Sequence, residues 1–233
     1  TVLENGNVGI GVSPTATYGG SGTLDASGPL VSRGQLATHQ TNAGVLQYGN
    51  NITSIRSYGA SSGSGSFVFK TGGGGVEDTT RMAIDAGGRV TMPSQPCFAA
   101  RAPQNTSGGG SSNGGTVSSG NLIFAASAFN NGSHYSTSNG RFTAPVTGHY
   151  YFSFSLLWDD SGNGTGYIAL RKNNSVSLQY GYAYVHDTGQ YGYLQVAGGA
   201  VVQLNANEYV QVYCSIAGWH IGSESNWAGF LLG

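Results

Sequence analysis

The chain has 233 residues, of which 40 are glycine and 14 are tyrosine, while only 8% are charged. A net charge of −1, with few and scattered basic residues, excludes the basic surface that nucleic-acid binding needs. No apolar run reaches the length of about eighteen residues that a membrane helix needs, so we expect no membrane insertion. Hydrophobic residues make up 39% and aromatic residues 11%, which favours short β-strands joined by tight turns over disorder. The composition predicts an all-β protein.

Residues 1 to 92 repeat a hairpin theme. Thr1 to Gly11 reads as two short strands around Asn5-Gly6, a favoured hairpin turn. Leu24 to Val31 and Ile84 to Thr91 each hold an apolar residue, an acid, small residues with glycine, and another apolar residue. Strand-like pieces with glycine-rich turns lie between these hairpins, at Gly44 to Tyr48, Ile52 to Tyr58 and Ser66 to Lys70.

Large apolar side chains are thinly spread over these residues, so we expect the segment to bury too little apolar area to fold alone. It becomes stable if its apolar residues meet those of other chains, which predicts an obligate oligomer. The stretches Gly6 to Gly11 and Arg81 to Pro93 resemble the shafts of bacteriophage tail fibres and related virion adhesins. The resemblance implies a trimeric β-shaft, joined to other tail proteins upstream of Thr1.

The two prolines Pro93 and Pro96 predict a boundary between a shaft, residues 1–92, and a head, residues 93–233. Cys97 to Ala102 reads as the first strand of the head, and a glycine- and serine-rich loop follows it. Cys97 and Cys214 match no metal or redox spacing, so we expect two buried free thiols rather than a disulfide.

An aromatic signature opens the body of the head. From Gly148 onward, aromatic residues alternate with smaller ones, which predicts a half-buried strand with an aromatic inner face. The signature positions are Phe124, Asn130, Tyr135, Phe142, Gly148, Tyr150, Phe152 and Phe154. Their spacing resembles that of C1q-like domains of the C1q/TNF superfamily, as do Val201 to Leu204, Glu208 to Val212 and Gly229 to Gly233. The resemblance implies a jelly roll of about ten strands and a homotrimer.

A tyrosine stripe follows, with Tyr180, Tyr182 and Tyr184 at period two and Tyr191 and Tyr193 in the next strand. One interpretation is packing in a seam between subunits, and the other is a ring platform for sugars. We assign Tyr180, Tyr182 and Tyr193 to the trimer interface.

Candidate metal and catalytic groups are few. Asp159, Asp160, Asn163 and Thr165 could ligate Ca²⁺, but they lack the spacing of a defined motif, so we predict no metal or other cofactor. A glycosidase needs two convergent carboxylates, for which only Asp187 with Glu208 or Glu224 come into question. We therefore predict that the protein is not an enzyme.

These features together predict a tail-fibre receptor-binding protein on the virion, exposed to the extracellular medium, that attaches a phage to a host glycan or protein receptor. The alternatives are a secreted C1q-like lectin or adhesion protein and a polysaccharide depolymerase. If the first and last strands of the head are neighbours, the loops at its opposite end are free to meet the host. The predicted receptor-binding residues are Trp158, Asp159, Asp160, Asn163, Tyr184, Asp187, Tyr191, Trp219, His220, Glu224 and Asn226.

Overall fold

The structure is a computed structural model that describes residues 43–49, 52–61, 64–72, 79–104, 116–117, 119–158, 164–187, 193–220, 222 and 224–233. The hairpins predicted at Thr1 to Gly11 and Leu24 to Val31 lie outside these residues. The described chain divides into two compact units. One holds the described residues up to Phe69 together with Ala83–Val90, and the other holds Lys70–Met82 together with Thr91–Gly233.

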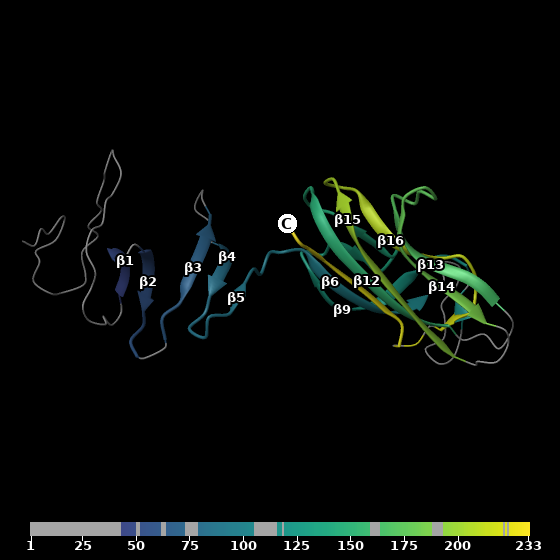
Figure 1. Ribbon diagram of the computed structural model, residues 1–233, viewed down its shortest axis with the longest axis horizontal. Coiled ribbons are helices and arrows are strands. Elements are labelled where there is room, and N and C mark those ends of the chain that lie inside the picture. Colours follow the sequence, from purple (N-terminus) through teal and green to yellow (C-terminus); the bar gives the residue numbers. More distant parts are fainter. Residues whose placement is uncertain are drawn as a thin grey trace, which may run out of the picture. The chain divides into compact units, whose positions relative to one another are not determined.

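The strands before residue 92 form small antiparallel sheets (Figure 1). Strands β1 (Ala43–Gly49) and β2 (Ile52–Tyr58) pair as a hairpin. A three-stranded sheet in the order β3-β4-β5 follows, with β3 at Phe67–Thr71, β4 at Thr79–Ile84 and β5 at Val90–Thr91. The three strand-like pieces predicted here are confirmed.

The turn between β4 and β5 shows why the hairpin theme needs an acid and glycine. One carboxylate oxygen of Asp85 accepts hydrogen bonds from the backbone N–H groups of Gly87 and Arg89, at 2.9 and 3.0 Å. Gly88 has a φ of 81°, which a residue with a Cβ rarely adopts. The predicted hairpin at Ile84 to Thr91 is confirmed.

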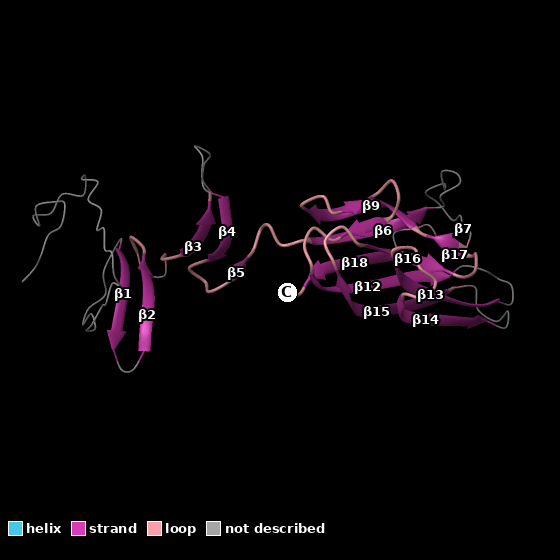
Figure 2. Ribbon diagram, turned by 90° about the horizontal axis from the view of Figure 1, so that it is seen from above, coloured by secondary structure: helices cyan, strands magenta, loops and turns pink. Residues whose placement is uncertain are grey.

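The head contains two facing antiparallel sheets (Figure 2). Its strands are β6 (Cys97–Gln104), β7 (Thr116–Val117), β8 (Gly120–Asn121), β9 (Ile123–Asn131), β10 (Tyr135–Ser136), β11 (Arg141–Thr143), β12 (Gly148–Trp158), β13 (Gly164–Lys172), β14 (Gln179–Asp187), β15 (Leu194–Leu204), β16 (Tyr209–Cys214), β17 (Trp219–His220) and β18 (Asn226–Leu231). The six-stranded sheet has the order β10-β11-β16-β13-β14, with β8 beside β16. The seven-stranded sheet has the order β7-β17-β12-β18-β6-β9, with β15 paired to β12.

The predicted all-β, two-sheet fold is confirmed, with more strands than the ten expected. Of the thirteen strands that the described residues of the head form, β7, β8, β10 and β17 have only two residues each. Such short pairings leave no clear period in a sequence, so only the longer strands were predicted.

The aromatic signature fills the space between the two sheets. Strand β12 alternates buried and more exposed residues along its length, as predicted, and Phe152 is completely buried. The ring of Phe152 lies 5.3 Å from that of Phe142 and 5.9 Å from that of Trp227, measured between ring centroids. The predicted inner face of this strand is therefore the centre of the core.

Two signature residues hold the chain by hydrogen bonds as well as by packing. The Tyr135 hydroxyl donates to the Phe124 carbonyl at 2.7 Å and accepts from the Phe124 N–H at 3.0 Å. The Asn130 side chain bonds both the N–H and the carbonyl of Tyr135. The buried polar groups of β9 and β10 thus satisfy one another, and the aromatic ring at position 135 stays fixed in the core.

The two ends of the head lie together. Strand β18 pairs with β6, the Gln95 side chain donates to the Leu231 carbonyl at 2.6 Å, and the His149 N–H donates to the Gly233 carbonyl at 2.8 Å. Figure 1 shows the C-terminus beside the start of β6. The prediction that the first and last strands of the head are neighbours is confirmed. The end of β12, the start of β13 and the end of β14 therefore lie on the opposite side of the head from its first and last residues.

Candidate recognition surface

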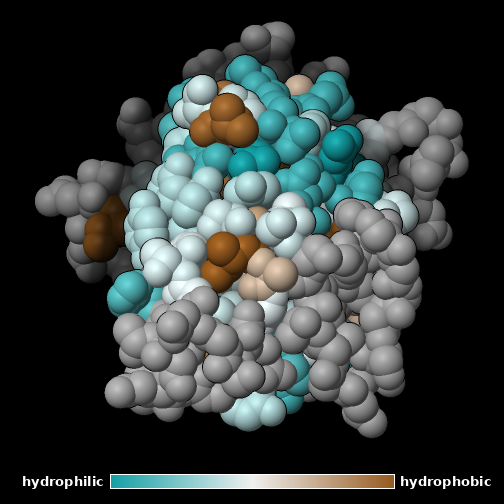
Figure 3. Space-filling model, turned by 90° about the vertical axis from the view of Figure 1, so that its right-hand side faces the viewer, coloured by the Kyte–Doolittle hydropathy of each residue, from teal (hydrophilic) through white to brown (hydrophobic). Residues whose placement is uncertain are grey.

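Several predicted receptor-binding residues belong to strand ends that meet at the far end of the head. Trp158, at the end of β12, pairs with Trp219 of β17. Gly164, at the start of β13, pairs with Asp187 at the end of β14. Figure 3 looks onto this end, where the coloured surface is mostly hydrophilic with small separate hydrophobic patches. Asp159, Asp160, Asn163, Tyr191 and the side chain of Asp187 lie outside what the structure describes.

The two tryptophans predicted to bind the receptor are instead core residues. Trp158 is 1% exposed and Trp219 is 0% exposed. Their indole N–H groups donate to the carbonyls of Ala217 and Ile216, at 3.1 and 2.9 Å. The prediction was wrong because Trp158 continues the inward positions of β12, a signal already present in the alternation that predicted the strand.

Three of the remaining candidates lie close together beside this buried pair. The ring of Tyr193 meets the ring of His220 edge-on, with centroids 6.4 Å apart. The His220 Nδ1 atom lies 3.3 Å from a carboxylate oxygen of Glu224 and accepts the Gly222 N–H at 3.1 Å. Tyr193 and Glu224 are exposed, and so is Asn226 at the start of β18. The structure thus gathers His220, Glu224 and Tyr193, which the sequence had assigned to different roles.

The tyrosine stripe of β14 does not form one face. Tyr180 packs against the core, whereas Tyr182 and Tyr184 point outward and are exposed. The register of β13 against β14 shifts between Ile168 and Leu170, and Gly181 has a φ of +61°. This β-bulge reverses the inward and outward alternation within the stripe, which a period-two pattern in the sequence could not show.

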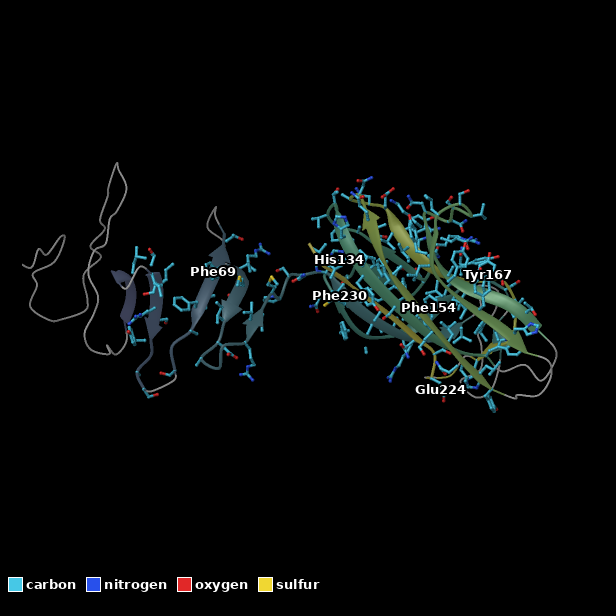
Figure 4. All side chains as sticks on the ribbon, viewed as in Figure 1. Phe69, His134, Phe154, Tyr167, Glu224 and Phe230 are labelled. Carbon is cyan, nitrogen blue, oxygen red and sulfur yellow. The ribbon has the colours of Figure 1, made fainter. Side chains whose placement is uncertain are left out.

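The outward tyrosines belong to a larger group on the outer face of the six-stranded sheet. We name Tyr167, Tyr182, Tyr184 and Tyr213 the tyrosine platform. Ring centroids lie 5.2 Å apart between Tyr167 and Tyr182, and 6.1 Å apart between Tyr167 and Tyr213. The rings of Tyr182 and Tyr184 are nearly parallel, with an interplanar angle of 13°. Figure 4 labels Tyr167 on this side of the head, away from Glu224.

Sequence reasoning missed Tyr167 and Tyr213 as site residues. They come from β13 and β16, which are distant in sequence and adjacent only in the folded sheet. The available signal was that each tyrosine is the sequence neighbour of a core residue, Ile168 or Val212, and therefore lies on the opposite face of its strand. Only the strand order could bring these outward tyrosines together with those of β14.

Asp187 and Glu208, one of the two pairs whose carboxylates a glycosidase would need to bring together, lie at opposite ends of β13. Asp187 pairs with the first residue of β13, whereas Glu208 forms an ion pair of 2.5 Å with Lys172, the last residue of that strand. Eight residues of extended strand separate these ends by roughly 26 Å. A hydrogen bond from the Lys172 ammonium is the main reason that the pKa of Glu208 lies below its ordinary value.

Other chemistry-bearing groups in the described part of the chain are dispersed. No three His, Cys, Asp or Glu side chains gather there as a metal site would require. No helix among those residues could span a membrane. Cys214 is buried, and burial raises the pKa of its thiol to about 12. Cys97 is only half-buried, so the expectation of two buried thiols is confirmed for Cys214 alone.

The chain was compared with known protein families and solved structures. Residues 110–232, more than half of the chain, match the family model of the C1q domain. The globular domain of zebrafish complement 1qA protein is 18% identical, with 60% of this chain and 98% of that chain covered and a TM-score of 0.44. Murine APRIL at pH 5.0 is 9% identical, with 59% and 99% covered and a TM-score of 0.45. The family match confirms the resemblance that the aromatic signature predicted: this chain belongs to the C1q domain family.

Proposed function

We propose that the chain is part of a virion tail-fibre protein that attaches a phage to its host through surface glycans. The observation that supports this is the combination of a C1q head with N-terminal sheets whose apolar side chains are not covered by a second layer of the described residues. Such sheets suit a fibre in which several chains supply the missing layer. The protein would lie on the virion, joined to other tail proteins and exposed to the extracellular medium.

The N-terminal sheets support the oligomer. Ile52 and Ile55 on β2 are 63% and 67% exposed, and Phe69 on β3 is exposed as well. A two-stranded hairpin is marginal in water without a packed face. Exposed apolar residues of this size on thin sheets mark a surface that other chains cover, and we propose that two further copies cover it in a homotrimer.

The head offers a second contact surface for these copies. C1q and TNF domains commonly form trimers. Tyr151, Val201 and Phe230 are exposed on the outer face of the seven-stranded sheet, where the rings of Tyr151 and Phe230 lie 5.6 Å apart. We propose this face as the trimer seam in place of Tyr180, Tyr182 and Tyr193, because Tyr180 turns toward the core and Tyr182 lies on the other sheet.

Sedimentation at micromolar concentration tests the oligomer, which we expect to run as a trimer. A folded, stable monomer would contradict the proposal.

Attachment is tested by incubating fluorescently labelled protein with a panel of bacterial strains before and after removal of their surface glycans. We expect binding to a subset of strains and its loss after glycan removal. Binding to animal cells alone would favour the secreted adhesion protein, and release of reducing sugar from the bacterial polysaccharide would favour the depolymerase.

A further inference from the structure

Two arginines on the outer face of the six-stranded sheet lie over tyrosine rings without an acidic partner. The guanidinium carbon of Arg171 is 3.3 Å from the centroid of the Tyr213 ring, and that of Arg141 is 4.1 Å from the centroid of Tyr209. The ion pairs among the described residues are Arg89 with Asp85, Lys172 with Glu208, and His220 with Glu224. Neither arginine on this face is therefore neutralised by a carboxylate in the described chain.

Arg171 is the more buried of the two. Only 7% of the residue is exposed, and its Nε atom has no hydrogen-bond partner within the described residues. Its neighbours across the sheet, Gln211 on β16 and Gln179 on β14, each keep a buried amide oxygen without a partner. A buried charge without a counter-ion is costly, and an anion bound from outside would remove that cost.

The tyrosine platform adjoins this charge. Tyr213 belongs to both the platform and the arginine stack, because its ring lies against the Arg171 guanidinium and near the ring of Tyr167. Tyr184, at the outer side of the platform, is 70% exposed. Exposed rings with hydroxyl groups provide an apolar surface for the C–H face of a sugar and hydrogen bonds for its hydroxyls.

We propose that the tyrosine platform and Arg171 form a binding site for an acidic saccharide, a sugar whose carboxylate pairs with Arg171 while its ring stacks on the tyrosines. This inference rests on the proposed function, because it names the class of glycan that the head takes. A neutral sugar would leave the charge of Arg171 unpaired, and a small inorganic anion would leave the rings unused. A saccharide with a carboxylate uses both features of the face.

The role of the Arg171 charge is tested by titration calorimetry on the full chain. The three ligands are trigalacturonate, fully methyl-esterified trigalacturonate and inorganic phosphate. We expect trigalacturonate to bind at least tenfold more tightly than the ester, and Arg171→Met to remove this difference. Arg171→Lys, which keeps the charge but loses the planar stack, should retain part of it. Failure of trigalacturonate to bind at millimolar concentration, phosphate binding of equal strength, or undiminished discrimination in Arg171→Met would each overturn the proposal.

The rings are tested independently of the buried arginine, since Arg171→Met can also weaken the sheet. Tyr184→Ala should weaken binding of both trigalacturonate and its ester at least tenfold, because the side chain is exposed and the fold does not depend on it. Tyr193→Ala is the matched control: Tyr193 is 64% exposed but lies outside the platform, next to β15 of the other sheet. Equal effects of the two variants would overturn the proposal.

Cell attachment separates this inference from the proposed function. If Tyr184→Ala loses both saccharide and host-cell binding, both stand. If it loses saccharide binding but attaches to cells normally, the acidic-saccharide site exists and the receptor site lies elsewhere. If the parent attaches to cells but does not bind trigalacturonate, the proposed function stands and the inference fails.

Discussion

The N-terminal sheets and the head use the same antiparallel strands but differ in where their apolar side chains go. On β12, Phe152 and Phe154 face a second sheet and are buried. On β2, Ile52 and Ile55 have comparable apolar area but face no second layer in the described chain and stay exposed. An apolar residue stabilises a strand only if another layer receives it. The head therefore carries its stability within one chain, and we propose that the N-terminal part depends on other chains.

The largest loss of stability is expected from a substitution in the core of the head. Phe152→Ala removes a ring packed against Phe98, Phe142 and Trp227, and should lower the free energy of unfolding by about 3–5 kcal/mol. Urea unfolding followed by tryptophan fluorescence measures it, because all three tryptophans lie in the head core. Val176→Ala, at an exposed turn position, is the control and should stay within about 0.5 kcal/mol of the parent. Equal losses in the two variants would contradict the core assignment.

The second prediction concerns the N-terminal part. Ile52→Asp with Ile55→Asp should weaken self-association at least tenfold, since burying each isoleucine contributes about 1.5–3 kcal/mol in an interface. Sedimentation across a concentration series measures the change. Thr53→Asp, an exposed substitution on the same strand, should leave association unaltered. If the double variant associates like the parent, these side chains are not covered by other chains.

The third prediction tests a polar contact within the head. Tyr135→Phe removes the hydroxyl that bonds the backbone of Phe124 on both sides, and should cost about 1–3 kcal/mol of unfolding free energy. Burial raises the pKa of Tyr135 from its ordinary 10.0 to about 12, so the neutral form is favoured in the folded state. That stabilisation is complete below pH 10 and is lost as the pH rises toward 12.

Urea unfolding between pH 8 and 12 measures this pH dependence. The parent should lose more stability than Tyr135→Phe between pH 10 and 12, while the contribution of Cys214 is common to both proteins. Parallel pH profiles would show that the Tyr135 hydroxyl is not buried in this way.

The smallest effect is expected at the exposed turn of the N-terminal part. Asp85→Ala removes the carboxylate that accepts from Gly87 and Arg89 and should raise the amide exchange rates of these two residues. The unfolding midpoint of the head should stay unchanged, because the turn does not belong to its core. The pKa of Asp85 is lowered mainly by the hydrogen bond from the Arg89 backbone N–H, so in the parent this protection should weaken as the pH falls below 4. Slow exchange in Asp85→Ala would contradict the role of the carboxylate.

The aromatic alternation of β12 and the turn residues at Asp85 to Gly88 specify local structure, so strands, hairpin and family could be predicted from the sequence. The positions of Trp158, Tyr180 and Tyr213 could not be predicted with equal success. Trp158 was predicted from its residue type, although its parity on β12 placed it in the core. The side on which Tyr180 lies depends on a one-residue bulge. The residues that surround Tyr213 depend on which strand pairs with β16. Tertiary pairing, rather than local pattern, therefore decides which side chains share a surface.

The pairing of β6 between β18 and β9 also determines how the head responds to force. When a particle attached at the far end of the head pulls on the chain before Cys97, the load runs along β6. The hydrogen bonds on both sides of β6 lie across that direction, so they share the load in shear and must break together. A pull that separates Cys97 from Gly233 would instead open the β6–β18 pairs one at a time. We therefore expect the sheet to resist a pull along β6, the direction in which the proposed attachment would load it, better than a pull that separates Cys97 from Gly233.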